Sequence, residues 1–454
     1  MTLCWRGVLR CGGIALAVAC TSPGKGMIAL EGATLIDGAG GAPKTDALIL
    51  IKDGSIRAVA RVNEIKIPRG AQRISLVGKT IIPGLIDAHA HVERWALPRY
   101  LAWGVTSVRD MHSPGDSGYA VKKDLDLGAI IGPRMYTAGA AIDGMSGRLS
   151  GVSAVAGDEE ARQAVDQRAV AGADFVKVYT KITPDLLQAI VDEAATLRLR
   201  VAAHLGKIDA LTAARAGVVS LEHITGVVAA AAPDASPYFR AHDIFFAGVT
   251  MEEVGWGALD SLMVARIARL LAATHVAIVP TLVEHETFAN LDDPRLPTRL
   301  GMTDVPADTA GRVRGVAALL QRSGWRAPEF AAFRRSRARQ NQFVREFRAA
   351  GGMVAAGTDA ANPLLVPGAS LHEELALLVA AGLTPIDAIT AATRHGAQLL
   401  GADSLGMVAP GRVADLVVLN RNPSEDVTAT RDIAWVMVRG RMLTPDSLRT
   451  EWSK

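Results

Sequence analysis

A repeated alternation of helix and strand patterns across residues 84–402 constrains this fold more than any other feature. In one unit, GDEEARQAVDQRAVAGADFVKVY (157–179), acidic residues open a helix, Gly172 closes it and an apolar strand follows. The stretches 183–204 and 207–223 repeat this order, and they end their strands at His204 and His223. Such alternation predicts parallel strands joined by crossover helices.

Eight strands of this kind can be counted in the sequence. They are expected near residues 82–88, 105–109, 134–138, 174–179, 200–204, 218–222, 276–281 and 353–358. Eight strand-helix units predict an α/β fold of the (β/α)8 TIM-barrel type, with an open doubly wound sheet as the alternative.

The two ends of the folded chain have a different, strand-rich texture. ALILIKDGSIRAV (47–59) predicts a hairpin at Asp53-Gly54, and ADLVVLNRNP and IAWVMVRGRML supply apolar strands near the C-terminus. Because neither end could bury a face alone, we expect residues 27–83 and 403–454 to form one small β-sandwich domain beside a barrel of residues 84–402.

Residues 1–26 resemble an export signal or lipoprotein leader. Arg6 and Arg10 precede the apolar stretch GGIALAVAC, whose Cys20 stands where a bacterial lipoprotein is lipidated. A periplasmic or membrane-anchored protein is therefore expected, with a disordered tail or a misplaced start codon on a cytoplasmic protein as the alternative. All three cysteines fall in this leader, so the folded body can contain no disulfide.

The charge balance bears on the partners of the chain. Its 49 Lys and Arg residues nearly match its 46 Asp and Glu residues, which gives no electrostatic case for binding nucleic acid. A small-molecule substrate is the expected partner, and the sequence leaves a homo-oligomer as an open alternative.

Polar residues gather where the predicted strands end. His89 and His91 lie two apart on the first strand, so their side chains face the same side. Lys177 lies on the fourth strand, and three further strands end at His204, His223 and Asp359. The carboxyl ends of barrel strands meet at one mouth, so these six residues are expected to form one site.

The residue types at this mouth suit borderline divalent metals such as zinc. Neutral imidazole and carboxylate are their preferred ligands. Lys177 is the exception, because an ammonium beside metal cations would be repelled and its pKa should fall.

These motifs resemble the amidohydrolase superfamily, and within it the imidazolonepropionase-related and prolidase-like branch. The resemblance rests on GKTIIPGLIDAHAHV, GVTSVRDM, GTDA, LHEELALLVAAGLTPIDAITAAT and LGMVAPGRVADLVVL, and covers nearly the whole mature chain. It implies two divalent metal ions, with zinc expected, bridged by a carbon dioxide-derived carbamate on Lys177 and by a hydroxide. By the same resemblance His89, His91 and Asp359 would hold one metal, and His204 and His223 the other.

The implied reaction is hydrolysis of a carbon–nitrogen bond. The bridging hydroxide attacks the substrate carbonyl, and Asp359 acts as general base and then as general acid. We expect an amide of a small molecule, such as an Xaa-Pro dipeptide, an N-acyl amino acid or a cyclic amide. A lactonase or phosphotriesterase on the same dinuclear site is the alternative, and a non-catalytic scaffold is a weaker third reading.

Four further residues are candidates for contacts with the substrate. Tyr179 shares a strand face with Lys177 and could bind a carbonyl or carboxylate, or it could be a packed core tyrosine. Arg109 and His112 could bind a substrate carboxylate, with a salt bridge to Asp110 or a loop hydrogen bond as the alternative. His372 is expected to support or cap a neighbouring group more readily than to touch substrate. The segment AIDGMSGRLSGV departs from the Gly/His-rich stretch typical of the related enzymes.

Overall fold

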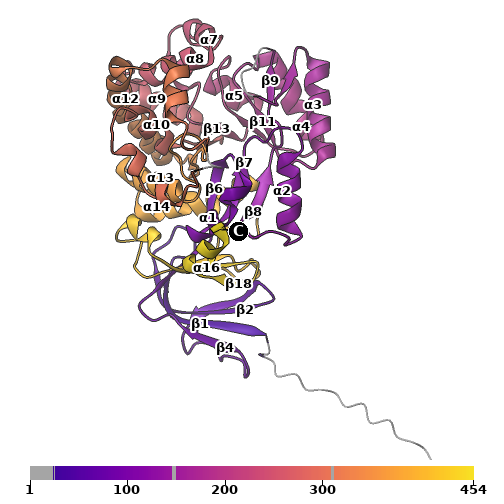
Figure 1. Ribbon diagram of the computed structural model, residues 1–454, viewed down its shortest axis with the longest axis vertical. Helices are drawn as coiled ribbons and strands as arrows, with labels where there is room; N and C mark the ends of the chain where they lie inside the picture. The colour runs from indigo at the N-terminus through magenta and orange to yellow at the C-terminus, as the bar shows by residue number, and fades with distance from the viewer. Residues whose placement is uncertain (1–23, 25, 146–149, 308–310, 454) are drawn as a thin grey trace, which may run out of the picture.

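The body of the protein is built on parallel strands (Figure 1). The computed structural model describes all residues except 1–23, 25, 146–149, 308–310 and 454, so the predicted leader with Cys20 lies outside the described part. Three strands, β6 (Leu85–Ala90), β7 (Val105–Asp110) and β8 (Arg134–Thr137), pair in parallel. A second parallel sheet has the order β10-β9-β11-β12-β13-β14-β15. Its strands are β9 (Ile142–Gly144), β10 (Ser153–Val155), β11 (Val176–Val178), β12 (Val201–Ala203), β13 (Ser220–Glu222), β14 (Ala277–Val279) and β15 (Met353–Val354).

Backbone hydrogen bonds join these two sheets at both ends. Ala88 N donates to Ala356 O at 2.9 Å, which links β6 to the segment after β15. Asp174 N donates to Thr137 O at 2.9 Å, which links the approach to β11 with β8. The eight strands predicted from sequence are therefore present as parallel neighbours, whereas β9 and β10 were not predicted.

Helices follow the strands and pack around them. They are α1 (Leu97–Ala102), α2 (Ser117–Asp126), α3 (Asp158–Ala171), α4 (Pro184–Thr196), α5 (Ala210–Ala216), α9 (Ser261–Ala272), α12 (Ala327–Ala349), α13 (Ala369–Ala380), α14 (Pro385–Thr390) and α15 (Gly396–Leu400), with a π-helical turn at Ala391–His395. Local sequence explains their ends: α3 stops at Gly172, which adopts a left-handed φ of 88°, and α5 is capped by Asp209, which accepts from the amides of Leu211 and Thr212.

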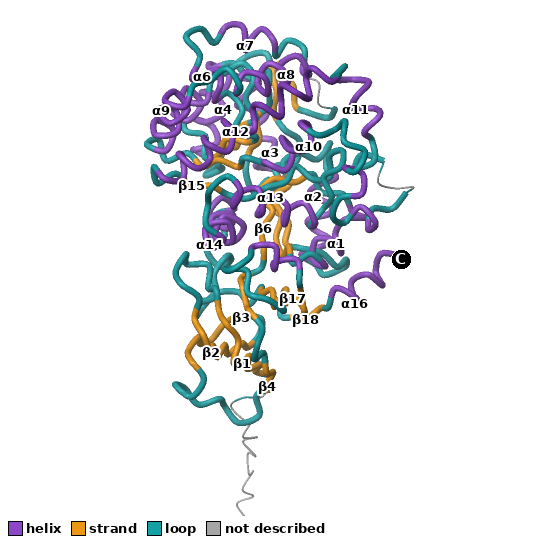
Figure 2. The backbone as a smooth tube through the Cα atoms, turned by 90° about the vertical axis from the view of Figure 1, so that its left-hand side faces the viewer, coloured by secondary structure: helices purple, strands orange, loops and turns teal. Residues whose placement is uncertain are grey.

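Residues from both chain ends share one sheet below this body (Figures 1 and 2). The sheet has the order β18-β17-β16-β5-β1-β2-β3, with β4 paired to β1. Its strands are β1 (Met27–Leu35), β2 (Lys44–Lys52), β3 (Ser55–Arg61), β4 (Gln72–Ser75), β5 (Thr80–Pro83), β16 (Leu416–Leu419), β17 (Ile433–Val438) and β18 (Arg441–Leu443), and the short helix α16 (Pro445–Arg449) follows. The antiparallel pair β5 and β16, in register at Ile82 and Val417, is where the two ends meet.

Two insertions lie over the carboxyl ends of the body strands. The first carries α6 (Val227–Ala231), α7 (Ser236–Ala241) and α8 (Phe245–Trp256) between β13 and α9. The second runs from α10 (Leu282–Ala289) to α11 (Val316–Ser323) and has its own apolar cluster, which includes Met302, Val313 and Trp325. Among the described residues, no helix is long and apolar enough to cross a membrane.

Candidate metal centre

The six predicted metal ligands lie together at the carboxyl ends of the body strands. His89 lies in β6 and Lys177 in β11. His91 directly follows β6, His204 directly follows β12 and His223 directly follows β13. Asp359 comes a few residues after β15. All six line one cavity of about 800 Å³. His223 and Asp359 have left-handed φ angles of 55° and 59°, which non-glycine residues rarely adopt and which cluster at functional sites.

Two imidazoles converge on one oxygen of Asp359. Its Oδ1 lies 3.2 Å from Nε2 of His89 and 3.0 Å from Nε2 of His91. Nδ1 of His89 lies 2.7 Å from Glu222, and Nδ1 of His91 lies 3.5 Å from the carbonyl oxygen of His112. Because both Nδ1 partners accept, the Nδ1 atoms carry the protons and both Nε2 atoms turn lone pairs toward a carboxylate.

A cation bound between these imidazole and carboxylate acceptors would remove their mutual repulsion. The site is buried, and its Nε2 and carboxylate donors are those of zinc and its first-row neighbours. Donor atoms of His89, His223 and Asp359 all lie within 4.8 Å of one another. The residues present therefore fit a divalent metal ion.

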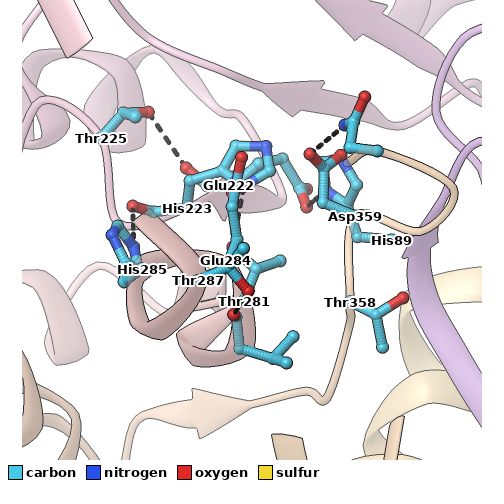
Figure 3. Close-up of polar contacts among 12 residues, drawn as sticks. His89, Glu222, His223, Thr225, Thr281, Glu284, His285, Thr287, Thr358 and Asp359 are labelled. Carbon is cyan, nitrogen blue, oxygen red and sulfur yellow. Dashed lines mark hydrogen bonds and ion pairs between the residues drawn. The ribbon is translucent and has the colours of Figure 1, made fainter. Parts of the chain in front are cut away.

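His223 is oriented in the same way from the opposite side (Figure 3). Its Nδ1 lies 2.8 Å from Oγ1 of Thr281 and 2.7 Å from Glu284, which stands on α10. Burial and the adjacent Asp359 carboxylate raise the pKa of Glu284 well above its usual range.

A buried network fixes the His89 ring from behind. Glu222 is fully buried and accepts from Ser220 Oγ at 2.6 Å and from Arg109 Nη1 at 3.3 Å as well as from His89. Burial would raise the pKa of Glu222, but Arg109 and His89 lower it to about 2. The carboxylate is therefore ionised and sets the tautomer of His89.

Lys177 is buried among these groups, and this burial disfavours the charged ammonium form of its side chain. Its burial lowers its pKa to about 8, although Glu222 and Asp359 act in the opposite direction. A lysine that readily becomes a neutral amine can react as a nucleophile, which formation of a carbamate requires.

Comparisons with known proteins show the family to which this chain belongs. The model of the amidohydrolase family matches residues 80–443. The chain belongs to the amidohydrolase family. It is 26% identical to an ochratoxinase of Aspergillus niger, over 91% of this chain and 85% of that protein. It is 27% identical to an imidazolonepropionase of Cereibacter sphaeroides, over 86% of this chain and 91% of that protein.

A solved structure extends the likeness to the whole fold of this amidohydrolase. A protein from Bifidobacterium longum assigned as a prolidase superposes with a TM-score of 0.69 at 25% identity, over 95% of this chain and all of the other. The protein is thus a hydrolase in the imidazolonepropionase-related and prolidase-like part of the family.

The four candidate substrate contacts divide into two pairs. Tyr179 and His112 line the cavity, Tyr179 with its ring 4.7 Å from that of His204. His112 already uses both ring nitrogens, since Nδ1 accepts from Ala141 N and Nε2 donates to Ser150 O. Burial, with a smaller effect of His91, lowers the pKa of His112 to about 4.

Arg109 and His372 do not line this cavity. Arg109 forms an ion pair with Glu222 and not with Asp110. Its side chain is buried behind the site, so it does not face an incoming substrate carboxylate. The two ring nitrogens of His372 contact Thr430 Oγ1 and Trp103 O, both at 2.9 Å. His372 is therefore a buried link between α13, α1 and the C-terminal segment, and burial lowers its pKa to about 4.

Several residues of the amidohydrolase cavity were missed by sequence reasoning. His242 and His285 were set aside because they fall outside the strand-end pattern, yet both line the cavity. Glu252 and Glu253 of α8 line it as well. The sequence does carry a signal for Glu222, since this carboxylate directly precedes the predicted ligand His223 and shares a strand face with Ser220.

Proposed function

We propose that this amidohydrolase cleaves the amide bond of a small substrate such as an Xaa-Pro dipeptide, an N-acyl amino acid or a cyclic amide. One observation carries the proposal: the Nε2 atoms of His89 and His91 both face a single oxygen of Asp359 inside an 800 Å³ cavity. Family membership supports hydrolysis at a carbon–nitrogen bond.

The proposal assigns two divalent metal ions, with zinc favoured by the ligands. His89, His91 and Asp359 would hold one ion, His204 and His223 the other, and a carbamate on Lys177 would bridge them. When bound, such ions acidify water and polarise a carbonyl.

The chain's own residues then handle the proton. The carboxylate of Asp359 lies at the cavity wall beside His89 and His91, where it would accept a proton from the attacking water. Asp359 next delivers that proton to the nitrogen of the leaving amine. Glu222 keeps the His89 ring in place during these steps, because the hydrogen bond between them leaves one ring orientation.

The architecture that holds this site is proposed to be a closed (β/α)8 barrel of residues 84–402 beside a β-sandwich domain of residues 27–83 and 403–454. The hydrogen bonds from Ala88 to Ala356 and from Asp174 to Thr137 support closure. Export directed by residues 1–26, ending in lipidation of Cys20 or in free release, completes the proposal.

Hydrolysis by the metal-loaded protein tests the substrate class. Panels of Xaa-Pro and other dipeptides, N-acyl amino acids, cyclic amides, lactones and phosphotriesters would be compared by kcat/KM. We expect turnover among the amides. Activity confined to lactones or phosphotriesters would reject the amide assignment, and no turnover of any panel would count against the proposed function.

A further inference from the structure

Two buried polar side chains of the cavity wall have no part in the metal centre. Among the described residues, buried side-chain atoms without a hydrogen-bond partner occur on many residues, but only two of those residues line the cavity: His242 and Glu252. Both ring nitrogens of His242 and Oε2 of Glu252 lack a partner there. A buried polar atom left unpaired costs about 1–3 kcal/mol, so such atoms at a cavity wall point to a ligand that pairs with them.

The two side chains are neighbours. Nε2 of His242 lies 3.8 Å from Oε1 of Glu252, and their side chains are 1% and 8% exposed. His242 ends α7 and Glu252 stands on α8, the two helices at the top of the body in Figure 1. Glu252 Oε1 accepts from Gly226 N at 3.2 Å, which leaves Oε2 as a carboxylate oxygen for another donor.

Two glycines fix the position of the His242 ring. A Cβ on Gly248 would lie 2.3 Å from Nδ1 of His242, and a Cβ on Gly206 would lie 2.9 Å from the same atom. A larger residue at either position would displace the ring. Gly206, which contacts the His242 ring, follows the candidate ligand His204 by two residues. His242 and Glu252 therefore lie beside the metal centre, in the wall of the same cavity.

Glu252 differs from the other carboxylates of this wall in its lack of a strong partner. Glu253, the next residue, receives hydrogen bonds from His285 and from Gln340. No lysine or arginine of the described chain forms an ion pair with Glu252, whose side chain is 8% exposed. A buried carboxylate without a basic partner is stabilised by a cation that also donates hydrogen bonds.

We propose that His242 and Glu252 form a subsite that binds a protonated amine of the substrate. Oε2 of Glu252 accepts from the ammonium group, and the imidazole of His242 offers a second acceptor beside it. Phe245 and Phe288 also line the cavity and supply apolar surface for the body of such a ligand. The inference rests on the proposed function only in taking this cavity as the substrate cavity, and it selects amides that carry a free amine.

Binding without turnover tests the subsite apart from hydrolysis. Isothermal titration of the metal-loaded full-length protein would compare phenethylamine with 2-phenylethanol, which has the same shape but a hydroxyl in place of the ammonium. We expect the amine to bind at least about tenfold more tightly, because hydrogen bonds to a charged group are worth more than neutral ones. Glu252→Gln should reduce that preference to within about twofold, since the carboxylate charge is what selects the cation.

A matched variant and a second substitution control for damage to the fold. Glu286→Gln makes the same chemical change on α10 at a side chain that pairs with Arg337 and does not line the cavity, so it should keep the preference. If Glu252→Gln fails to fold, His242→Phe keeps a ring but removes both nitrogens, and it should weaken amine binding several-fold.

Either of two results would overturn the subsite. One is equal binding of the two probes to the wild-type protein, which would mean that water alone satisfies the two side chains. The other is a preference that Glu252→Gln leaves intact or, where that variant does not fold, amine binding that His242→Phe leaves unchanged. A protein that prefers the amine yet hydrolyses no amide would instead contradict the proposed function and leave the subsite standing.

Discussion

Arg109→Met separates a structural role for this arginine from a role in binding substrate. The guanidinium lies fully buried, with Nη1 3.3 Å from Glu222 and Nη2 donating to Ser220 Oγ at 3.0 Å. It also stacks over the ring of Phe175, 4.6 Å from the centroid. Replacing it with methionine leaves the charge of Glu222 buried without its cation.

The size of the effect follows from that burial. Removing one partner of a buried ion pair costs about 3–5 kcal/mol, so the free energy of unfolding should fall by that amount. Arg94 forms an ion pair with Asp124 at the surface, where its side chain is 56% exposed, and Arg94→Met should change the free energy of unfolding by less than about 1 kcal/mol. The double variant Arg109→Met/Glu222→Gln should recover about 1 kcal/mol or more relative to Arg109→Met, because no lone buried charge remains.

Denaturant unfolding followed by circular dichroism measures these differences. A chelator should be present throughout, so that metal binding does not add to the stability of the folded state. Unfolding free energies that agree for wild type and Arg109→Met, together with a raised KM, would refute the structural role and restore Arg109 as a substrate contact.

Three further substitutions address the site and its surroundings. Asp359→Asn should lower kcat by at least about 10²-fold while much of the bound metal remains by elemental analysis, and a kcat near wild type would count against its proton role. Burial raises the pKa of Glu374 from 4.5 to about 8, so the folded protein binds the extra proton and stability should fall as pH rises from about 5 to 8. Glu374→Gln should flatten that fall in melting temperature, and an unchanged pH profile would contradict the assignment. His372→Leu should lower the free energy of unfolding by about 1–3 kcal/mol with KM unchanged, whereas a KM effect alone would return His372 to the substrate site.

The strands and the six candidate ligands were predictable because both depend on local sequence. Apolar runs flanked by helix patterns mark the strands, and parallel strands bring their carboxyl ends together whatever the details of packing. His89, Lys177, His204, His223 and Asp359 therefore fell into one cavity, as did His91.

The partners of buried side chains could not be predicted, because they come from distant parts of the chain. Arg109 meets Glu222 across 113 positions, and His372 meets Thr430 across 58 positions. The cavity wall formed by His242 and α8 was missed for the same reason: the positions of His242 and Glu252 depend on how an insertion folds back over the strand ends. Loops and insertions of this kind carry specificity, and one sequence alone does not fix their packing.

Metal content tests the central claim most directly. Elemental analysis of the purified full-length protein, saturated with zinc and then freed of excess, should give about two ions per chain in a dinuclear site of this kind. Lys177→Ala should lose at least one of them together with activity, while Lys181→Ala, at a lysine that does not line the cavity, should keep both. Wild-type protein without stoichiometric metal, or a Lys177→Ala variant with full metal content and full activity, would contradict the account.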